Sequence, residues 1–259
     1  DMDLGIAGKT ALVTGGSRGL GRQAALSLAA EGVNVAICGR TQDTLDLTVA
    51  ELEALGVKAI GLIGDVSDVE TMAELHKNAV TGLGLIDILV NNVGGTRSRE
   101  DITGTSVDDF KATFDLNVFG GYQLMREVIP HMQGQSWGRI INIASIWGRE
   151  TGGNISYMAA KAALIGATRS TAMSLAKDGI LVNSIAPGSI AHAGGSWESF
   201  QNNQPPEVVE QFIATQLPMG KFGWPEPLGD LIAFLCSDRA GLITGACIVV
   251  DGGQSHSMI

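Results

Sequence analysis

The sequence predicts an α/β protein in which a parallel sheet of about seven strands carries helices on both faces. Short runs of β-branched residues alternate with longer stretches of helical periodicity along the chain. This alternation is typical of strand–helix–strand units, which place their strands parallel to one another. No composition break, repeat or low-complexity tract interrupts the pattern, so residues 1–259 are expected to form a single doubly wound domain.

Each element follows from its local pattern. Strands are expected at 10–13, 33–38, 58–63, 86–90, 139–143, 181–185 and 247–250, and helices at 21–30, 41–55, 69–80, 106–131 and 155–177. Thr41 and Ser106 are suited to be N-caps, and Pro130 lies near the end of the fourth helix. Residues 189–206 are polar and rich in glycine, which predicts a long loop before a helix near 207–216. Long loops in compact domains are often lids, so 189–222 is a candidate lid.

The composition is that of a folded globular protein with many tight turns, because 45% of the residues are hydrophobic and 35 are glycine. The net charge of −10 disfavours nucleic acid as a partner, since such binders usually carry a basic surface. Cys38, Cys236 and Cys247 lie in apolar runs without a CxxC spacing, as buried reduced thiols do. Because no secretory leader and no membrane-spanning run is recognised, we expect a soluble, cytoplasmic protein with no membrane partner.

A glycine-rich segment, 14–21, follows the first expected strand and precedes a helix. Its glycines permit positive φ angles and a close approach of the backbone to a ligand. The free N–H groups at the start of the next helix favour a pyrophosphate. The segment also satisfies the GxGxxG/A pattern, from Gly19 to Ala24, although that pattern alone fits an ordinary glycine-rich turn. It is not a P-loop, because no GK[ST] follows.

Tyr157 and Lys161 are four residues apart in the helix expected at 155–177, so both side chains share one helix face. A lysine ammonium near a phenol favours the phenolate and lowers the phenol pKa. Such a pair suits general acid–base chemistry on a carbonyl or an alcohol. The spacing alone also fits an ordinary surface pair. Tyr122 has Arg126 at the same spacing, but a guanidinium differs from an ammonium in donor geometry.

Five motifs follow one another in the order TGGSRGLG, NNVG, INIAS, YMAAK and PG. In this combination, from Lys9 to Gly253, the chain resembles the short-chain dehydrogenase/reductase family. Among its members, the chain is similar to 3-oxoacyl-carrier-protein reductases and to sugar or polyol dehydrogenases. The resemblance implies a Rossmann fold, a homotetramer, and hydride transfer between a nicotinamide cofactor and a small carbonyl or secondary alcohol substrate, without a metal.

The resemblance also implies a role for each motif residue. Ser145 would hydrogen-bond the substrate oxygen and Tyr157 would exchange a proton with it. Lys161 would lower the pKa of Tyr157 and hold the nicotinamide ribose, while Asn117 would hold a water that relays protons through Lys161. The cofactor would be bound by Gly15, Ser17, Arg18, Gly19, Leu20, Gly21, Arg40, Asp65, Val66, Asn91, Gly94, Tyr157, Lys161, Pro187, Gly188 and Ile190.

The strand at 33–38 is followed by Gly39 and Arg40. In dinucleotide-binding folds a carboxylate is expected about here to hold the ribose hydroxyls of NAD. Gly39 removes the repulsion of a 2′-phosphate, and Arg40 supplies a planar cation suited to phosphate. Arg18 is expected to approach the same phosphate from the glycine loop. These residues predict NADP(H), with an NAD-preferring dehydrogenase as the alternative.

Two positions depart from the family pattern. Val93 stands where the family often has Ala, a change expected only to repack the loop. His192 stands five residues after Pro187, where the family often has a Thr that touches the nicotinamide carboxamide. We assign His192 no catalytic role and expect the neighbouring Ser189 to be a candidate for that contact.

The substrate pocket is expected to be built by three segments, namely 95–100, 146–150 and the candidate lid. Arg97, Arg99 and Arg149 lie in these segments, which motivates the hypothesis that one of them meets an anionic group on the substrate. Solvation or pairing with neighbouring glutamates explains them as well. Trp147 is a candidate wall for an apolar or cyclic ketone, and Trp197 is a candidate pocket residue from the lid.

Two other functions remain open on this fold. One is a non-catalytic dinucleotide-binding sensor or structural subunit, which would typically lack the tyrosine or the lysine. The other is an epimerase or dehydratase. The presence of Asn117, Ser145, Tyr157 and Lys161 together favours the oxidoreductase.

Overall fold

A computed structural model describes residues 2–258, and these residues form a seven-stranded sheet. The strand order is β3-β2-β1-β4-β5-β6-β7, and every neighbouring pair is parallel. The strands are β1 (Thr10–Thr14), β2 (Asn34–Gly39), β3 (Ala59–Ile63), β4 (Ile88–Asn91), β5 (Gly138–Ile143), β6 (Ile180–Pro187) and β7 (Cys247–Val250). The predicted α/β class with a parallel sheet is therefore confirmed.

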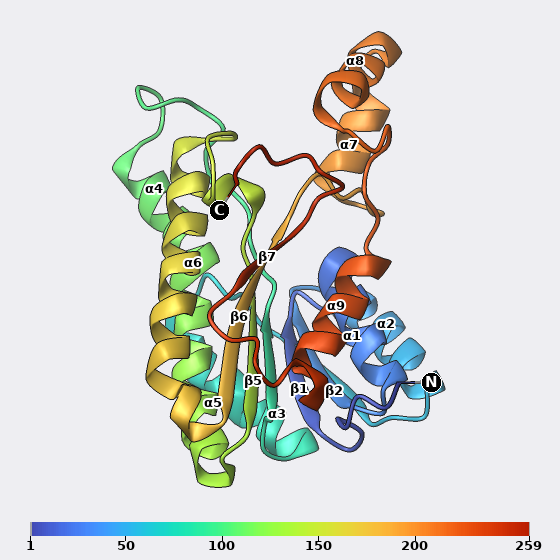
Figure 1. Cartoon of the computed structure of the whole chain (residues 1–259), viewed down its shortest axis with the longest axis vertical. Coiled ribbons are helices and arrows are strands. Elements are labelled where there is room, and N and C mark those ends of the chain that lie inside the picture. Colours follow the sequence, from blue (N-terminus) through green and yellow to red (C-terminus); the bar gives the residue numbers. More distant parts are fainter. Residues whose placement is uncertain (1, 259) are drawn as a thin grey trace.

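Helices cover both faces of the sheet, as Figure 1 shows. One face carries α1 (Gly19–Ala30), α2 (Gln42–Ala54) and α9 (Glu226–Cys236), and the other carries α3 (Met72–Leu83), α4 (Val107–Phe114), α5 (Gly120–Gln135) and α6 (Ile155–Leu175). Successive strand residues point to opposite faces. Ala11 and Val13 of β1 thus pack in the core under α1 and α9, and Leu12 packs in the core under α3 and α5.

The order of the strands reverses between β1 and β4. The chain runs outward from β1 through β2 to β3, returns to β4 beside β1, and then continues to β7. In open α/β sheets ligands bind beyond the carboxyl ends of the strands at such a reversal. The glycine loop follows β1 and the segment beginning at Asn92 follows β4, so both lie at this point.

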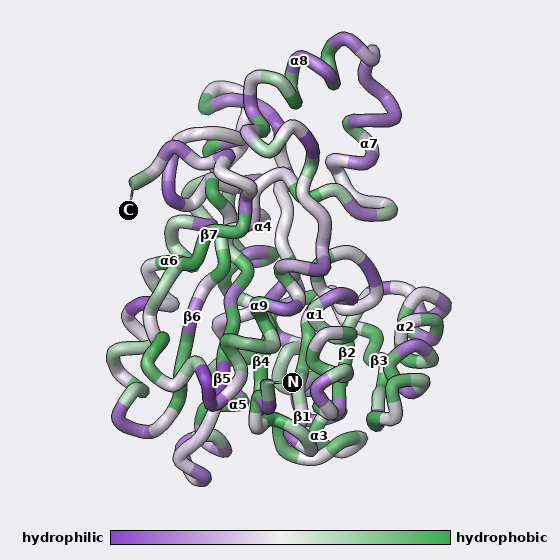
Figure 2. The backbone as a smooth tube through the Cα atoms, turned by 45° about the vertical axis from the view of Figure 1, so that its right-hand side comes forward, coloured by the Kyte–Doolittle hydropathy of each residue, from purple (hydrophilic) through white to green (hydrophobic). Residues whose placement is uncertain are grey.

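The candidate lid contains two helices, α7 (Ser196–Asn203) and α8 (Pro206–Gln216), which stand beyond the carboxyl ends of the strands (Figure 1). Figure 2 shows that α7 is mostly hydrophilic and that α8 mixes hydrophilic and hydrophobic residues. Between them lie four aromatic rings, Trp197, Phe200, Phe212 and Phe222, with centroids 5.1 to 6.4 Å apart. Trp197 therefore packs in a small aromatic cluster of the lid, and its place in the substrate pocket stays a prediction.

Several element boundaries differ from the predictions. The segment 189–206 is not a continuous loop, because its aromatic residues bury themselves by forming α7. No element was predicted at α9, although its apolar face packs on α1. The helix expected at 106–131 extends to Gln135 and is interrupted by a π-helical turn, Asp115–Phe119. Four 3₁₀ turns are also present, at Val69–Thr71, Ile146–Gly148, Ala176–Asp178 and Asp238–Ala240.

The three cysteines are free thiols. Burial raises the pKa of Cys38 to about 11 and that of Cys236 to about 12, whereas Cys247 on β7 is only half-buried, contrary to expectation. Within residues 2–258 no group of His, Cys, Asp or Glu is arranged to hold a metal ion. Over the same range, no helix combines the length and the hydropathy needed to cross a membrane.

Candidate active site

The glycine loop joins β1 to α1 with a backbone that needs glycine. Gly15 and Gly19 have φ angles of +63° and +56°, which side chains disfavour. A Cβ on Gly21 would lie 2.3 Å from the carbonyl oxygen of Gly15, so the loop closes directly on the first turn of α1. The loop therefore presents backbone rather than side chains at a helix N-terminus, which fits a pyrophosphate.

Asn92, which the sequence analysis did not assign, holds this loop to the end of β4. Its side-chain nitrogen donates to the carbonyl oxygens of Thr14, at 3.0 Å, and Gly15, at 3.4 Å. In return, the Thr14 hydroxyl accepts from the backbone nitrogens of Asn92, at 2.9 Å, and Val93, at 3.2 Å. The signal that could have revealed Asn92 is an amide residue directly after β4, opposite the glycine loop.

Arg40 and Asp65 lie at the end of the cleft formed by β2 and β3. Asp65 Oδ1 accepts from the Ser67 hydroxyl, at 2.7 Å, and from the Ser67 backbone nitrogen, at 2.9 Å. These two bonds are the main reason why the pKa of Asp65 is lowered, and the charges of Arg40 and Arg97 add to the effect. A carboxylate thus remains ionised here, under the influence of two arginines, where the adenosine of a dinucleotide is expected.

Arg97 reaches toward the segment that follows β3. Its guanidinium donates to the Ser67 hydroxyl at 3.2 Å, and its charge helps to lower the pKa of Asp65. Its place in a substrate pocket stays a prediction. Its backbone nitrogen donates to Thr113 Oγ1, which fixes the start of the loop over α4. The sequence could not show this placement, because it depends on how the loop after β4 folds back toward the end of β3.

The candidate catalytic side chains Ser145, Tyr157 and Lys161 meet at the carboxyl end of β5. Ser145 follows the strand and accepts from the Trp147 backbone nitrogen at 3.1 Å. Asn154 caps α6 by accepting from the Tyr157 backbone nitrogen at 2.9 Å, and the Tyr157 phenol hydrogen-bonds the Ser145 side chain. The Lys161 ammonium donates to the carbonyl of Ile143 at 2.8 Å.

Asn117 reaches the same place because the π-helical turn widens the helix at that residue. Its amide donates to the carbonyl oxygens of Thr113 and Gly95, both at 2.7 Å, and accepts from the Gly95 nitrogen at 3.1 Å. A Cβ on Gly94 would lie 2.7 Å from the Lys161 ammonium and 2.9 Å from Asn117 Oδ1. The absence of a side chain at Gly94 therefore lets Lys161 and Asn117 approach the backbone of this loop closely.

The two titratable groups of the site are shifted toward their neutral forms. Burial lowers the pKa of Lys161 to about 7. Tyr157 is half-buried, and desolvation raises its pKa, while the neighbouring Ser145 acts in the opposite direction. The direction is opposite to the expected lowering by Lys161, because the ammonium lies 5.6 Å from the centre of the phenol ring and is itself buried.

The other residues predicted to bind the cofactor differ in their surroundings. Asn91 is buried in the sheet, where its amide donates to Asn142 and to Gly121, so its side chain belongs to the interior of the fold. The carbonyl of Val66 lies against Gly120, beside the π-helical turn. Pro187 ends β6, and Gly188 and Ile190 lead into the lid.

Gln254, which the sequence analysis also did not identify, anchors the base of the lid. Its side-chain oxygen accepts from the Ser189 backbone nitrogen at 2.7 Å, and its nitrogen donates to the Ser189 hydroxyl at 2.9 Å. Ser189 is only 4% exposed, and its hydroxyl accepts from Gln254, while its expected contact with the nicotinamide carboxamide stays a prediction. Ile190 pairs with Gly223, which closes the lid at its other end.

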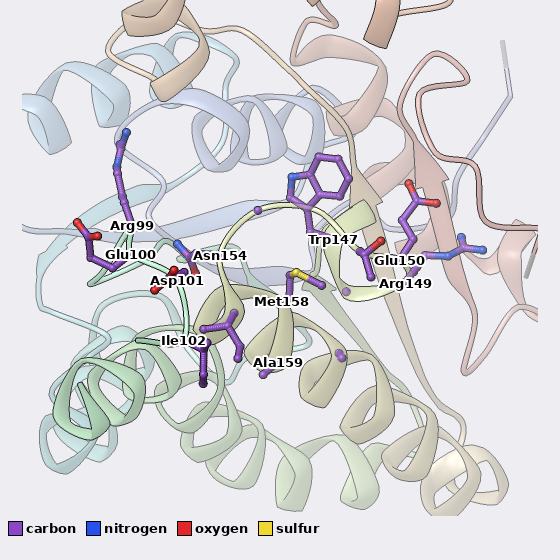
Figure 3. Close-up of a pocket in the computed structure, with 15 residues that line it drawn as sticks. Arg99, Glu100, Asp101, Ile102, Trp147, Arg149, Glu150, Asn154, Met158 and Ala159 are labelled. Atoms are coloured by element: carbon purple, nitrogen blue, oxygen red, sulfur yellow. The ribbon is translucent and has the colours of Figure 1, made fainter. Parts of the chain in front are cut away.

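Trp147 and Arg149 line a cavity of about 780 Å³ between the loop after β4 and the start of α6 (Figure 3). Its α6 residues, Ile155, Met158, Ala159 and Ala162, lie on the helix face opposite to Tyr157 and Lys161. The Trp147 ring packs on Gly152 and Gly153, where a Cβ would collide with it or touch it. This cavity therefore lies on the other side of α6 from the Tyr157 and Lys161 side chains.

Arg99 and Arg149 both line the cavity of Figure 3, and the Arg149 guanidinium also donates to the Cys247 carbonyl of β7 at 3.4 Å. Arg97 instead donates to the Ser67 hydroxyl, beyond the end of β3. The hypothesis that one of these arginines meets an anionic group on the substrate stays a prediction.

The chain was compared with known proteins. The family model described as "Enoyl-(Acyl carrier protein) reductase" matches residues 15–255. The 3-oxoacyl-[acyl-carrier-protein] reductase FabG of Staphylococcus aureus is 37% identical over 248 residues, which cover 95% of this chain and 98% of that protein. The 2-dehydro-3-deoxy-L-rhamnonate dehydrogenase (NAD(+)) of Sphingomonas is 34% identical and covers 96% of both chains.

The fold is also shared with solved structures. L-Sorbose reductase from Gluconobacter frateurii, complexed with NADPH and L-sorbose, superposes with a TM-score of 0.92 at 30% identity, covering 99% of this chain and 100% of that chain. The match thus spans the sheet, the glycine loop and the lid together. The chain belongs to the short-chain dehydrogenase/reductase family, and is an oxidoreductase that uses a nicotinamide dinucleotide on carbonyl or alcohol substrates.

Proposed function

We propose that this chain transfers a hydride between NADP(H) and a carbonyl or secondary alcohol, with Ser145, Tyr157, Lys161 and Asn117 as its catalytic set. The observation that carries the proposal is that Ser145, Tyr157 and Lys161 lie together at the carboxyl end of β5, where Ser145 influences the Tyr157 phenol and Lys161 donates to the Ile143 carbonyl. A bound nicotinamide ring supplies the hydride, or accepts it, at its C4 atom.

In the reducing direction the protein residues manage the substrate oxygen and the proton. Ser145 hydrogen-bonds the carbonyl oxygen and polarises it, and the Tyr157 phenol gives that oxygen its proton while the carbonyl carbon gains the hydride. The resulting tyrosinate regains a proton through Lys161, whose pKa of about 7 allows it to carry and release protons near neutral pH. Asn117 holds the backbone of the segment at Gly95 and, like Lys161, lies close to Gly94.

The preference for NADP(H) is supported by the end of β2. Gly39 carries no side chain, Arg40 supplies a cation, and the charge of Arg40 acts on Asp65 at the adenosine end of the cleft. The L-sorbose reductase structure contains NADPH, whereas the rhamnonate relative is named for NAD(+), so the family uses both cofactors. An NAD-preferring dehydrogenase is the second candidate, and the absence of a carboxylate at Gly39 argues against it.

The homotetramer remains part of the proposal. Large apolar side chains are exposed along the outer surface of α4 to α6, for example Val107 (70%), Phe119 (46%) and Met173 (71%). Burying such a surface is favourable, which supports pairing of these helices between subunits. Light scattering should give a tetrameric mass for the natural chain and a smaller one for Phe119→Glu, whereas a monomeric mass for the natural chain would contradict the proposal.

The activity is tested with a panel of ketones and alcohols, each with NADP(H) and with NAD(H), by the absorbance of the reduced nicotinamide. Tyr157→Phe serves as the blank, and Tyr122→Phe on the exposed side of α5 is the matched control. We expect turnover with NADP(H) to fall about 10²- to 10⁴-fold in Tyr157→Phe and to persist in the control. Tight cofactor binding without turnover of any substrate would instead favour a non-catalytic sensor.

A further inference from the structure

His192, at the position where the chain departs from the family pattern, lies directly on the glycine loop. A Cβ on Gly19 would be 2.5 Å from His192 Cε1 and 2.6 Å from Nε2. The imidazole ring therefore occupies the space beside the residue at which α1 begins. Two features require glycine at position 19. Its φ is +56°, and the imidazole ring leaves no room for a Cβ.

A tight turn in the lid holds the ring in this place. The Gly195 nitrogen donates to the His192 carbonyl at 2.9 Å, and Gly194 adopts a φ of +70°. A Cβ on Gly195 would lie 2.7 Å from His192 Cε1, so the ring fits between two glycines, one from the loop and one from the lid. The Glu198 carboxylate accepts from the Gly194 nitrogen at 2.7 Å and so fixes the turn to the start of α7.

The two ring nitrogens have different surroundings. Nδ1 donates to the carbonyl of Ala193 at 3.1 Å, because a carbonyl can only accept. Nε2 faces Gly19, and no hydrogen bond to it is present within residues 2–258. In the neutral ring Nε2 is then an acceptor, and on protonation it becomes a charged donor aimed at the loop.

The charged groups around the ring favour an anion at this point. Arg18, from the loop, lies over the turn with Nη1 3.4 Å from the Gly194 carbonyl, and Glu198, from α7, is engaged with the Gly194 nitrogen. The backbone N–H groups at the start of α1 add the positive end of the helix dipole. An anion on the loop would thus face Arg18, the imidazole and the helix N-terminus together.

We propose that His192 is a cofactor-binding residue whose Nε2 donates to the pyrophosphate of the dinucleotide and so couples closure of the lid to cofactor binding. The inference rests on the proposed function, since it requires a dinucleotide on the glycine loop. It differs from the contact of the family threonine with the nicotinamide carboxamide, because the ring touches Gly19, at the pyrophosphate end. A charged imidazole would donate to the pyrophosphate more strongly than a neutral one, so we expect tighter cofactor binding at pH 6 than at pH 8.

The test uses two ligands, NADP⁺ and ADP-ribose, with isothermal titration calorimetry at pH 6 and pH 8. ADP-ribose carries the pyrophosphate but neither the nicotinamide nor the 2′-phosphate, so titration of the 2′-phosphate and contacts with the nicotinamide do not enter its result. The variants are His192→Gln, which keeps a neutral donor, and His192→Ala, which removes it. His256→Gln is the matched control, because His256 is exposed and its own backbone contacts Glu150.

For the natural chain and for His256→Gln we expect ADP-ribose to bind about tenfold more tightly at pH 6 than at pH 8, as a charge-assisted hydrogen bond implies. His192→Gln should show a clearly smaller difference between the two pH values, because only Lys161, with its pKa of about 7, then changes charge near the ligand. His192→Ala should show the same reduced pH dependence, and at pH 6 it should bind about tenfold more weakly than the natural chain.

The other outcomes overturn the inference in distinguishable ways. Unchanged ADP-ribose binding in both His192 variants, with weakened NADP⁺ binding, would place the residue at the nicotinamide instead. Unchanged binding of both ligands would assign the ring to packing of the lid alone. Failure of the natural chain to bind either ligand would refute the proposed function together with this inference.

Discussion

The ammonium of Lys161 lies 5.6 Å from the centre of the Tyr157 ring and donates to the carbonyl of Ile143, not to the phenol. The two side chains share one face of α6, as their spacing predicted, yet burial dominates the pKa of each. The protein thus holds a lysine with a pKa of about 7 in its interior. A buried, easily neutralised lysine has consequences for stability as well as for catalysis.

Lys161→Met is expected to stabilise the fold while removing activity. The native pKa of about 7 is well below the value of about 10.4 in an unfolded chain, so the unfolded state binds more protons between these values. The free energy of unfolding should therefore rise from pH 7 to pH 10 in the natural chain, and this rise should be smaller in the variant. At pH 7 the variant should be more stable by about 1–3 kcal/mol. Urea denaturation from pH 6 to pH 10 measures both effects, and identical pH profiles would contradict the lowered pKa.

Arg40→Asp is expected to reverse the cofactor preference. The new carboxylate can accept from the ribose hydroxyls of NAD and repels a 2′-phosphate, so the ratio of kcat/KM for NADP(H) to that for NAD(H) should fall by at least about 100-fold. Arg22→Gln is the control, because it removes an arginine that pairs with Glu51 at 2.6 Å on the surface. An unchanged ratio in Arg40→Asp would count against the assignment of the 2′-phosphate.

Arg97→Ala is expected to weaken binding of both cofactors to a similar extent. Its guanidinium reaches Ser67 and Asp65 across the adenosine end of the cleft, a feature common to NAD and NADP. A loss of about three- to tenfold in affinity is expected from one exposed, charge-assisted contact. Arg99→Ala, two residues away in the cavity of Figure 3, should leave the affinity unchanged. Fluorescence titration with each reduced cofactor distinguishes this role from one in substrate binding, which would change only the substrate KM.

Gly21→Ala is expected to disrupt the glycine loop. Its Cβ would lie 2.3 Å from the Gly15 carbonyl oxygen and 2.4 Å from Asn92 Nδ2, so both must move. We expect a loss of about 2–4 kcal/mol in unfolding free energy, typical of steric overpacking, together with loss of cofactor binding. Gly134→Ala in α5 meets no atom within 4 Å and should instead stabilise the protein by about 0.5–1 kcal/mol. Thermal denaturation and cofactor titration of the two variants give the comparison, and a Gly21→Ala protein as stable as the natural chain would show that the loop can relax.

The order of strands and helices was predictable because local patterns determine it. Short runs of β-branched residues indicated all seven strands, and the glycine loop and the Tyr157–Lys161 spacing placed the candidate site at the ends of β1 and β5. The errors occur where burial comes from distant residues. Helix α7 forms because Trp197 and Phe200 pack on Phe212 and Phe222, and no local spacing reveals that contact.

The sequence by itself determined the fold class, the family and the identity of the candidate catalytic residues, since these depend on spacing within single elements and on the order of motifs. Only the tertiary structure decided where long side chains lie: Arg97 at Ser67, Arg149 at β7, and His192 against Gly19. It also decided that the pKa of Tyr157 is raised, because desolvation depends on all the chain segments that surround the phenol.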